Sequence, residues 1–186
     1  MALRVHYGID PGKLGAWSIF IDGELNRVAR LPIITTPPKR TKSGRITAKG
    51  KFELNMPSLL EELRASMGEN VGAAFSATIE RVGENAMPQR EGQEVSGGLM
   101  SMAKLAGMAG ELRGILASLG VPFERVQPAV WKKHFGIGKD KDESRILAMK
   151  LWPWLDLKFK NQADLAEAAL VGAYGLLKSG DFDGVR

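Results

Sequence analysis

The chain has 186 residues, of which 44% are hydrophobic and 25% are charged, and its formal net charge is +5. This length and composition fit one ordinary globular domain with a core of its own, and they exclude the disordered and fibrous classes. Because the chain contains no cysteine, disulfides, thiolate zinc sites and cysteine nucleophiles are excluded as well, so any metal would be bound by oxygen or imidazole ligands.

The first elements along the chain are predicted to be strands. Two β-rich runs, Leu3–Ile9 and Ala16–Ile21, come before the dipeptide Asp22-Gly23. This dipeptide favours a two-residue hairpin, because both residues tolerate positive φ. A third strand is expected over Leu25–Ile34.

The next segment, Thr35–Lys51, is strongly basic. Its Pro37-Pro38 and Ser43-Gly44 pairs favour turns, so we expect a mobile loop or a long hairpin arm at about residues 35–51. It holds six basic residues and no acidic one: Lys39, Arg40, Lys42, Arg45, Lys49 and Lys51. A second tract, 125–160, has nine basic and four acidic residues, so the rest of the chain sums to −6. This segregation indicates a polyanion-binding face, and solvated loops are the alternative that composition leaves open.

The remainder of the chain alternates helices with short strands. A strand over Gly72–Ile79 ends at Glu80, and an exposed loop is expected over Arg81–Gln93. Val121–Val126 is predicted as a further strand. Helical periodicity predicts helices over Pro57–Met67, Ser96–Leu119, Ala129–Phe135, Lys141–Leu151 and Gln162–Leu177. The order of elements is that of a single α/β domain spanning residues 1–186.

Four carboxylates stand where an active site could form. Asp10 ends an apolar strand before Pro11-Gly12, and Glu80 ends another. Asp164 and Glu167 are three apart, so they project from one face of the last helix. Each has an ordinary alternative, as a turn cap, a solvated strand end, or an acid near a helix N-terminus. Four convergent carboxylates would need cations between them, and hard oxygen ligands select Mg²⁺ or Mn²⁺.

Four motifs together resemble the RuvC-type Holliday-junction resolvases. They are Ile9-Asp10-Pro11-Gly12, Ile79-Glu80-Arg81-Val82, Phe135-Gly136-Ile137-Gly138-Lys139, and the run Gln162 to Ala168. The order and spacing match across nearly the whole chain, apart from residues 35–51 and the tail after Lys178.

The resemblance implies an RNase H-like fold, with a five-stranded mixed sheet flanked by helices. It also implies a homodimer that cuts four-way DNA junctions with Mg²⁺. By position, Asp10, Glu80, Asp164 and Glu167 resemble the family's four metal-binding carboxylates. The lysines that resemble its DNA contacts are Lys132, Lys133, Lys139 and Lys141, and the basic arm adds Lys39, Arg40, Lys42 and Arg45 as expected DNA contacts.

Two features depart from the bacterial pattern. Glu167 stands where that pattern has Asp, as in some phage relatives, and Gly83 falls near the position of its junction-opening aromatic residue. The Asp164-x-x-Glu167 ending and the basic insert at 35–51 lead us to expect a phage-type enzyme, in the cytoplasm of a bacterium or of a phage-infected cell. No charge-free run approaches the ~20 apolar residues that a membrane span needs.

The chemistry expected on this basis is two-metal phosphodiester hydrolysis, with two Mg²⁺ ions, or Mn²⁺ as a substitute, held by the four carboxylates. One alternative is a broader nuclease for flaps and other branched DNA, and another is a junction-binding module without catalysis. An actin-like sugar kinase shares the Asp-Pro-Gly turn but needs about twice this length.

A dimer interface is expected along Ser96–Leu119, where Gly107, Gly110 and Gly114 share a face beside Met100, Met102 and Met108. Packing of that glycine face on the chain's own sheet is the alternative.

Overall fold

The computed structural model describes the whole chain except residues 1, 13, 49–50, 83–97 and 181–186. Its centre is a five-stranded sheet in the order β3-β2-β1-β8-β9, formed by Glu24–Arg30, Ala16–Ile21, Arg4–Asp10, Ala74–Glu80 and Phe123–Val126. The pairs β1/β2 and β2/β3 are antiparallel, and β1/β8 and β8/β9 are parallel. The predicted mixed five-stranded sheet is therefore confirmed.

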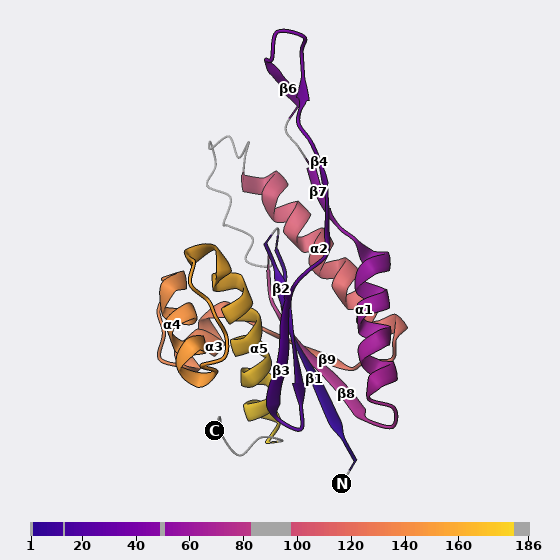
Figure 1. Ribbon diagram of the computed structural model, residues 1–186, viewed down its shortest axis with the longest axis vertical. Coiled ribbons are helices and arrows are strands. Elements are labelled where there is room, and N and C mark those ends of the chain that lie inside the picture. Colours follow the sequence, from indigo (N-terminus) through magenta and orange to yellow (C-terminus); the bar gives the residue numbers. More distant parts are fainter. Residues whose placement is uncertain (1, 13, 49–50, 83–97, 181–186) are drawn as a thin grey trace, which may run out of the picture.

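Helices cover both faces of this sheet (Figure 1). On one face lie α1 (Met56–Glu69) and α2 (Gly98–Ser118), and on the other lie α3 (Pro128–His134), α4 (Lys141–Leu151) and α5 (Ala163–Ser179). A 3₁₀ turn, η1 (Lys160–Gln162), leads into α5. The result is an α/β fold of three layers.

The two faces of the sheet have separate apolar cores, because successive side chains of a strand point to opposite sides. In β1, Val5, Tyr7 and Ile9 pack with residues of α1 and α2, including Leu59 and Leu112. The other core joins β2 to the remaining helices through Phe20, Trp131, Ala166 and Leu170. The alternate residues of β1 therefore face α5.

The predicted third strand is wrong at its C-terminal end. β3 stops at Arg30, and β4 (Ile33–Thr36) pairs instead with β7 (Lys51–Leu54) in a separate two-stranded ladder. Pro32 lies at the break and has no N–H to donate to a neighbouring strand, while the N–H of Leu31 donates to the carbonyl of Gly15. The chain therefore leaves the central sheet at this point.

The basic segment extends from this break as a narrow projection. Beyond the β4/β7 ladder, β5 (Lys39–Arg40) pairs with β6 (Ile46–Ala48), and Figure 1 shows both ladders rising away from the body. We call Ile33–Leu54 the basic arm. It leaves the same end of the sheet at which β1 ends and α5 begins (Figure 1).

Most other predicted elements agree with the structure to within a few residues. The Asp22-Gly23 turn has positive φ at both residues, 47° and 87°, as a two-residue hairpin requires. The helix predicted over Pro57–Met67 begins one residue earlier, at Met56, and continues two residues further, to Glu69. The loop predicted at Arg81–Gln93 lies almost wholly outside the described residues. Among the helices that the structure describes, none is long and apolar enough to cross a membrane.

Candidate metal and nucleic-acid site

Strand register places two of the predicted acids at one end and on one face of the sheet. Ile9 pairs with Ile79 in the parallel β1/β8 ladder, so Asp10 and Glu80 are the next residues of neighbouring strands. Ile9 and Ile79 belong to the core under α1 and α2. Asp10 and Glu80 therefore face the side covered by α5 and α3.

Helix α5 brings the other two acids to this end because it packs unusually close to β1. A Cβ added to Gly8 would lie 2.4 Å from the carbonyl oxygen of Ala168 and 2.5 Å from the nitrogen of Gly172. Only glycine permits this approach. The Ser18 hydroxyl also donates to the Ala168 carbonyl, at 2.9 Å. The N-terminal turns of α5 are thereby held against the strand that ends in Asp10.

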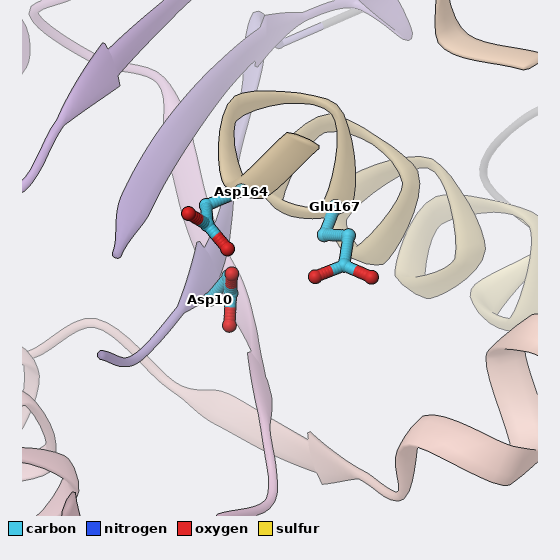
Figure 2. A group of neighbouring side chains, drawn as sticks. All are labelled: Asp10, Asp164 and Glu167. Atoms are coloured by element: carbon cyan, nitrogen blue, oxygen red, sulfur yellow. The ribbon is translucent and has the colours of Figure 1, made fainter. Parts of the chain in front are cut away.

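Three carboxylates meet in the resulting site. Asp10, Asp164 and Glu167 each offer an oxygen within 4.8 Å of the others, and the three residues are only 6%, 8% and 4% exposed. Figure 2 shows Asp10 at the strand end beside Asp164, with Glu167 one turn further along α5 and facing the same space. Burial makes an uncompensated cluster of carboxylates costly. Hard oxygen donors in this arrangement suit a divalent cation such as Mg²⁺ or Mn²⁺.

Two cationic side chains contact the cluster from its edges. Lys132 donates to Glu167 Oε1 at 2.6 Å, and the Ser144 hydroxyl lies 3.3 Å from the same oxygen. Arg30 Nη1 lies 3.4 Å from Asp164 Oδ2. The same guanidinium donates to the carbonyl oxygens of Leu14 and Asn161, so it joins the β1–β2 turn to η1. These contacts orient the acids and partly offset their charge.

Glu80 lines the same pocket, of about 420 Å³, but is oriented by a different group. The indole N–H of Trp131 donates to Glu80 Oε2 at 2.7 Å, and Trp131 is completely buried. The structure thus brings Asp10, Asp164 and Glu167 into one cluster and holds Glu80 beside it.

Three of these supporting residues were not anticipated from the sequence. Arg30 lies opposite Ala16, which pairs with Asp10, but the register of the β2/β3 ladder shifts between Ile19 and Phe20, so the Asp22-Gly23 hairpin alone does not predict this position. Trp131 and Ser144 lie on separate helices, and no sequence signal distinguishes them from core residues.

The predicted basic residues have several locations. Lys132 and Lys139 line both the acidic pocket and a second pocket of about 630 Å³, to which Lys133 also contributes. Lys141 begins α4, but its side chain lies outside the described part of the structure. The four arm cations, Lys39, Arg40, Lys42 and Arg45, are all exposed.

The glycines of α2 do not pack on the chain's own sheet. Gly107 and Gly114 are exposed, and a Cβ added to either would meet nothing within 4 Å among the described residues. Met108 was expected beside them at an interface, which is wrong: it is 5% exposed and belongs to the core under α1 and α2. One helical position separates Gly107 from Met108, and a rotation of ~100° per residue places them on different faces.

Comparison with known proteins identifies the fold. No family model and no curated protein matches this sequence. Among solved structures, the RuvC structure from Thermus thermophilus superimposes with a TM-score of 0.50 at 12% identity, covering 96% of this chain and 98% of that one. The T. thermophilus RuvC in complex with Holliday junction substrate has the same coverage, with a TM-score of 0.46 at 13% identity. The chain thus has the RuvC-like, RNase H-like fold.

Proposed function

We propose that this chain is a single nuclease domain that cuts branched DNA, four-way junctions above all, by hydrolysing phosphodiester bonds with divalent metal. One observation carries the proposal: three buried carboxylates converge within 4.8 Å at the end of β1, on an RNase H-like sheet. The RuvC-like fold supports four-way DNA as the substrate. Its setting is proposed to be the cytoplasm of a bacterium or of a phage-infected cell.

The residues present fit Mg²⁺ ions. Asp10, Asp164 and Glu167 would bind them, and Glu80 would join from the adjoining wall of the pocket. Divalent ions held there supply Lewis-acid stabilisation of the phosphate charge and a water of lowered pKa. The protein's own part is to fix the carboxylates, through Arg30, Lys132, Ser144 and Trp131, and to keep them buried among apolar neighbours.

The basic residues suit a DNA path that leads to the acids. Lys132 and Lys139 lie between the acidic pocket and the neighbouring one, where Lys133 is also placed. Phosphates that occupy this neighbouring pocket would be attracted by three lysines beside the cutting site. The basic arm leaves the body at the same end (Figure 1), so its four cations can contact a more distant part of the same DNA. Such contacts provide affinity without sequence information.

A homodimer follows from the symmetry of the proposed substrate. Resolution of a four-way junction requires two symmetric nicks, and one chain has one acidic cluster among its described residues. We place the interface on the exposed glycine face of α2, where Gly107 and Gly114 would let another backbone approach. Sedimentation should then give about twice the mass of one chain, and Gly107→Arg should shift the protein toward the monomer without lowering its melting temperature.

The test of function is a panel of labelled DNAs. Purified protein is incubated with four-way, three-way, flap and linear duplex DNA of matched arm sequence, with Mg²⁺ or with EDTA. We expect nicks in the four-way junction, only with Mg²⁺, at paired symmetric positions. Equal cutting of flaps and junctions would indicate the broader nuclease, and tight junction binding with no cutting in Mg²⁺ or Mn²⁺ would indicate a binding module.

A further inference from the structure

Two large apolar side chains are exposed in segments that contact the acidic site, Leu14 in the β1–β2 turn and Phe159 at the start of η1. Phe159 is 67% exposed and Leu14 is 50% exposed, although most aromatic and leucine side chains of this chain lie in one of the two cores. Leu14 lines the acidic pocket itself. Single exposed apolar side chains are common on protein surfaces, but an aromatic ring near a site offers a flat apolar face on which a ligand can stack.

The Arg30 guanidinium links Leu14, and the segment that follows Phe159, to the acids. It donates to the backbone carbonyls of Leu14 and of Asn161, and its Nη1 lies 3.4 Å from Asp164 Oδ2. Phe159 is two residues from Asn161, and two residues extend at most ~7 Å. Nucleotides repeat every ~3.4 Å along a strand, so the Phe159 backbone lies within a few nucleotides of a phosphate bound at the acids.

The backbone under the Phe159 ring is held in place. Its N–H donates to Gln162 Oε1 at 2.8 Å, and its carbonyl accepts from the Gln162 N–H at 2.9 Å. The connection that precedes it is anchored by the buried side chains of Leu155 and Leu157, and by Arg145, which donates to the Leu157 carbonyl at 2.7 Å. A base that stacks on this ring would not have to order the loop first, which lowers the cost of binding.

Charged groups beside the ring suit a nucleic acid. Lys158 and Lys160 flank Phe159, and their side chains are 70% and 87% exposed. Lys158 pairs with Asp156 at 2.8 Å and Lys160 with Asp142 at 3.0 Å. Exposed pairs of this kind are weak, so either lysine can turn to a phosphate at little cost. The charged side chains around Phe159 would add no binding energy to a contact with the apolar face of a protein partner.

We propose that Phe159 is a stacking platform for an unpaired base of the branched DNA, near the phosphate at the acidic site. This inference rests on the proposed function, because it takes branched DNA as the ligand. Aromatic rings bind bases without regard to sequence. The platform therefore selects DNA whose bases can leave the duplex, as they can at a branch point.

The test compares two exposed aromatic residues of the same connection. Trp154 is 55% exposed and is the matched control, since it lies farther along the chain from Asn161 and Asp164. Binding is measured in EDTA, without cutting, for a four-way junction carrying 2-aminopurine at its branch point and for a duplex of the same sequence. One stack supplies roughly 5- to 150-fold in affinity.

We expect Phe159→Ala to weaken junction binding by that factor, to remove the quenching of 2-aminopurine and to leave duplex binding unchanged. Phe159→Trp should restore both signals, and Trp154→Ala should change neither. Equal loss for junction and duplex, an unchanged junction affinity, or a change of sedimentation in Phe159→Ala would overturn the platform while the proposed function stands. A parent protein that does not prefer the junction to the duplex would overturn both.

Discussion

The hydrogen bond from Trp131 to Glu80 offers a test of how this site is held together. Trp131→Phe keeps an aromatic ring in the same buried position but removes the N–H that donates to Glu80 Oε2 at 2.7 Å. A hydrogen bond to a charged group is worth about 1.5–3 kcal/mol. If that free energy serves to position Glu80 for metal and phosphate, its loss lowers the cleavage rate by about 10- to 150-fold.

The chain contains a matched control for this substitution. Trp17 is 1% exposed, and its indole nitrogen has no hydrogen-bond partner among the described residues. Trp17→Phe therefore removes the same atoms from a buried site without breaking a hydrogen bond, and loses no more than the packing of the deleted atoms. Trp17→Phe is expected to lower the melting temperature no more than Trp131→Phe does, with the fall in cleavage confined to Trp131→Phe.

The assay is single-turnover nicking of a labelled four-way junction, at saturating protein and over a range of Mg²⁺ concentrations. We expect Trp131→Phe to need more Mg²⁺ for half-maximal rate and to cut more slowly at saturation, while its affinity for the junction in EDTA stays that of the parent. A Trp131→Phe enzyme with the parent's rate and Mg²⁺ dependence would refute the positioning role. So would an equal loss in Trp17→Phe.

Two further predictions concern the fold and the arm. Gly8→Ala should destabilise the protein by roughly 1–3 kcal/mol or more in urea unfolding, because its Cβ would collide with the backbone of α5. Gly68→Ala is the control, since its Cβ would meet nothing within 4 Å among the described residues. Its stability should be unchanged or higher. Replacement of the four arm cations by alanine should weaken binding equally for all junction sequences and flatten the plot of log K against log[salt] by about 0.9 for each phosphate that the arm no longer neutralises. An unchanged slope would mean that the arm does not touch DNA.

Much of this fold could be predicted because local signals and the global arrangement agree. The Asp22-Gly23 turn fixes the first hairpin, and the apolar run before Glu80 predicts a central strand. The alternation in β1 places Val5, Tyr7 and Ile9 on one face, and this same alternation turns Asp10 to the other. The predicted convergence of Asp10, Asp164 and Glu167 follows from these elements once α5 lies on β1.

What could not be predicted depends on contacts between distant segments. Apolar periodicity continues through Leu31, so only the lack of a donor at Pro32 signals that the third strand ends early. Trp131 looks like any core aromatic residue until β8 and α3 are side by side. For Met108 and Gly107, the face that meets the sheet depends on how α2 is rotated, and a helix rich in small residues and methionine on every side gives a weak indication of that rotation.

The most direct test of the account is the nicking rate of the four-way junction by Asp10→Asn, measured beside the parent protein and beside its own affinity for the junction. The substitution keeps the shape of the side chain but removes one charge from the cluster that would hold Mg²⁺. The account predicts that cleavage falls by orders of magnitude while junction affinity in EDTA is equal or higher, since a negative charge beside phosphate is gone. Cleavage at the parent's rate would contradict the claim that this buried cluster is the catalytic centre.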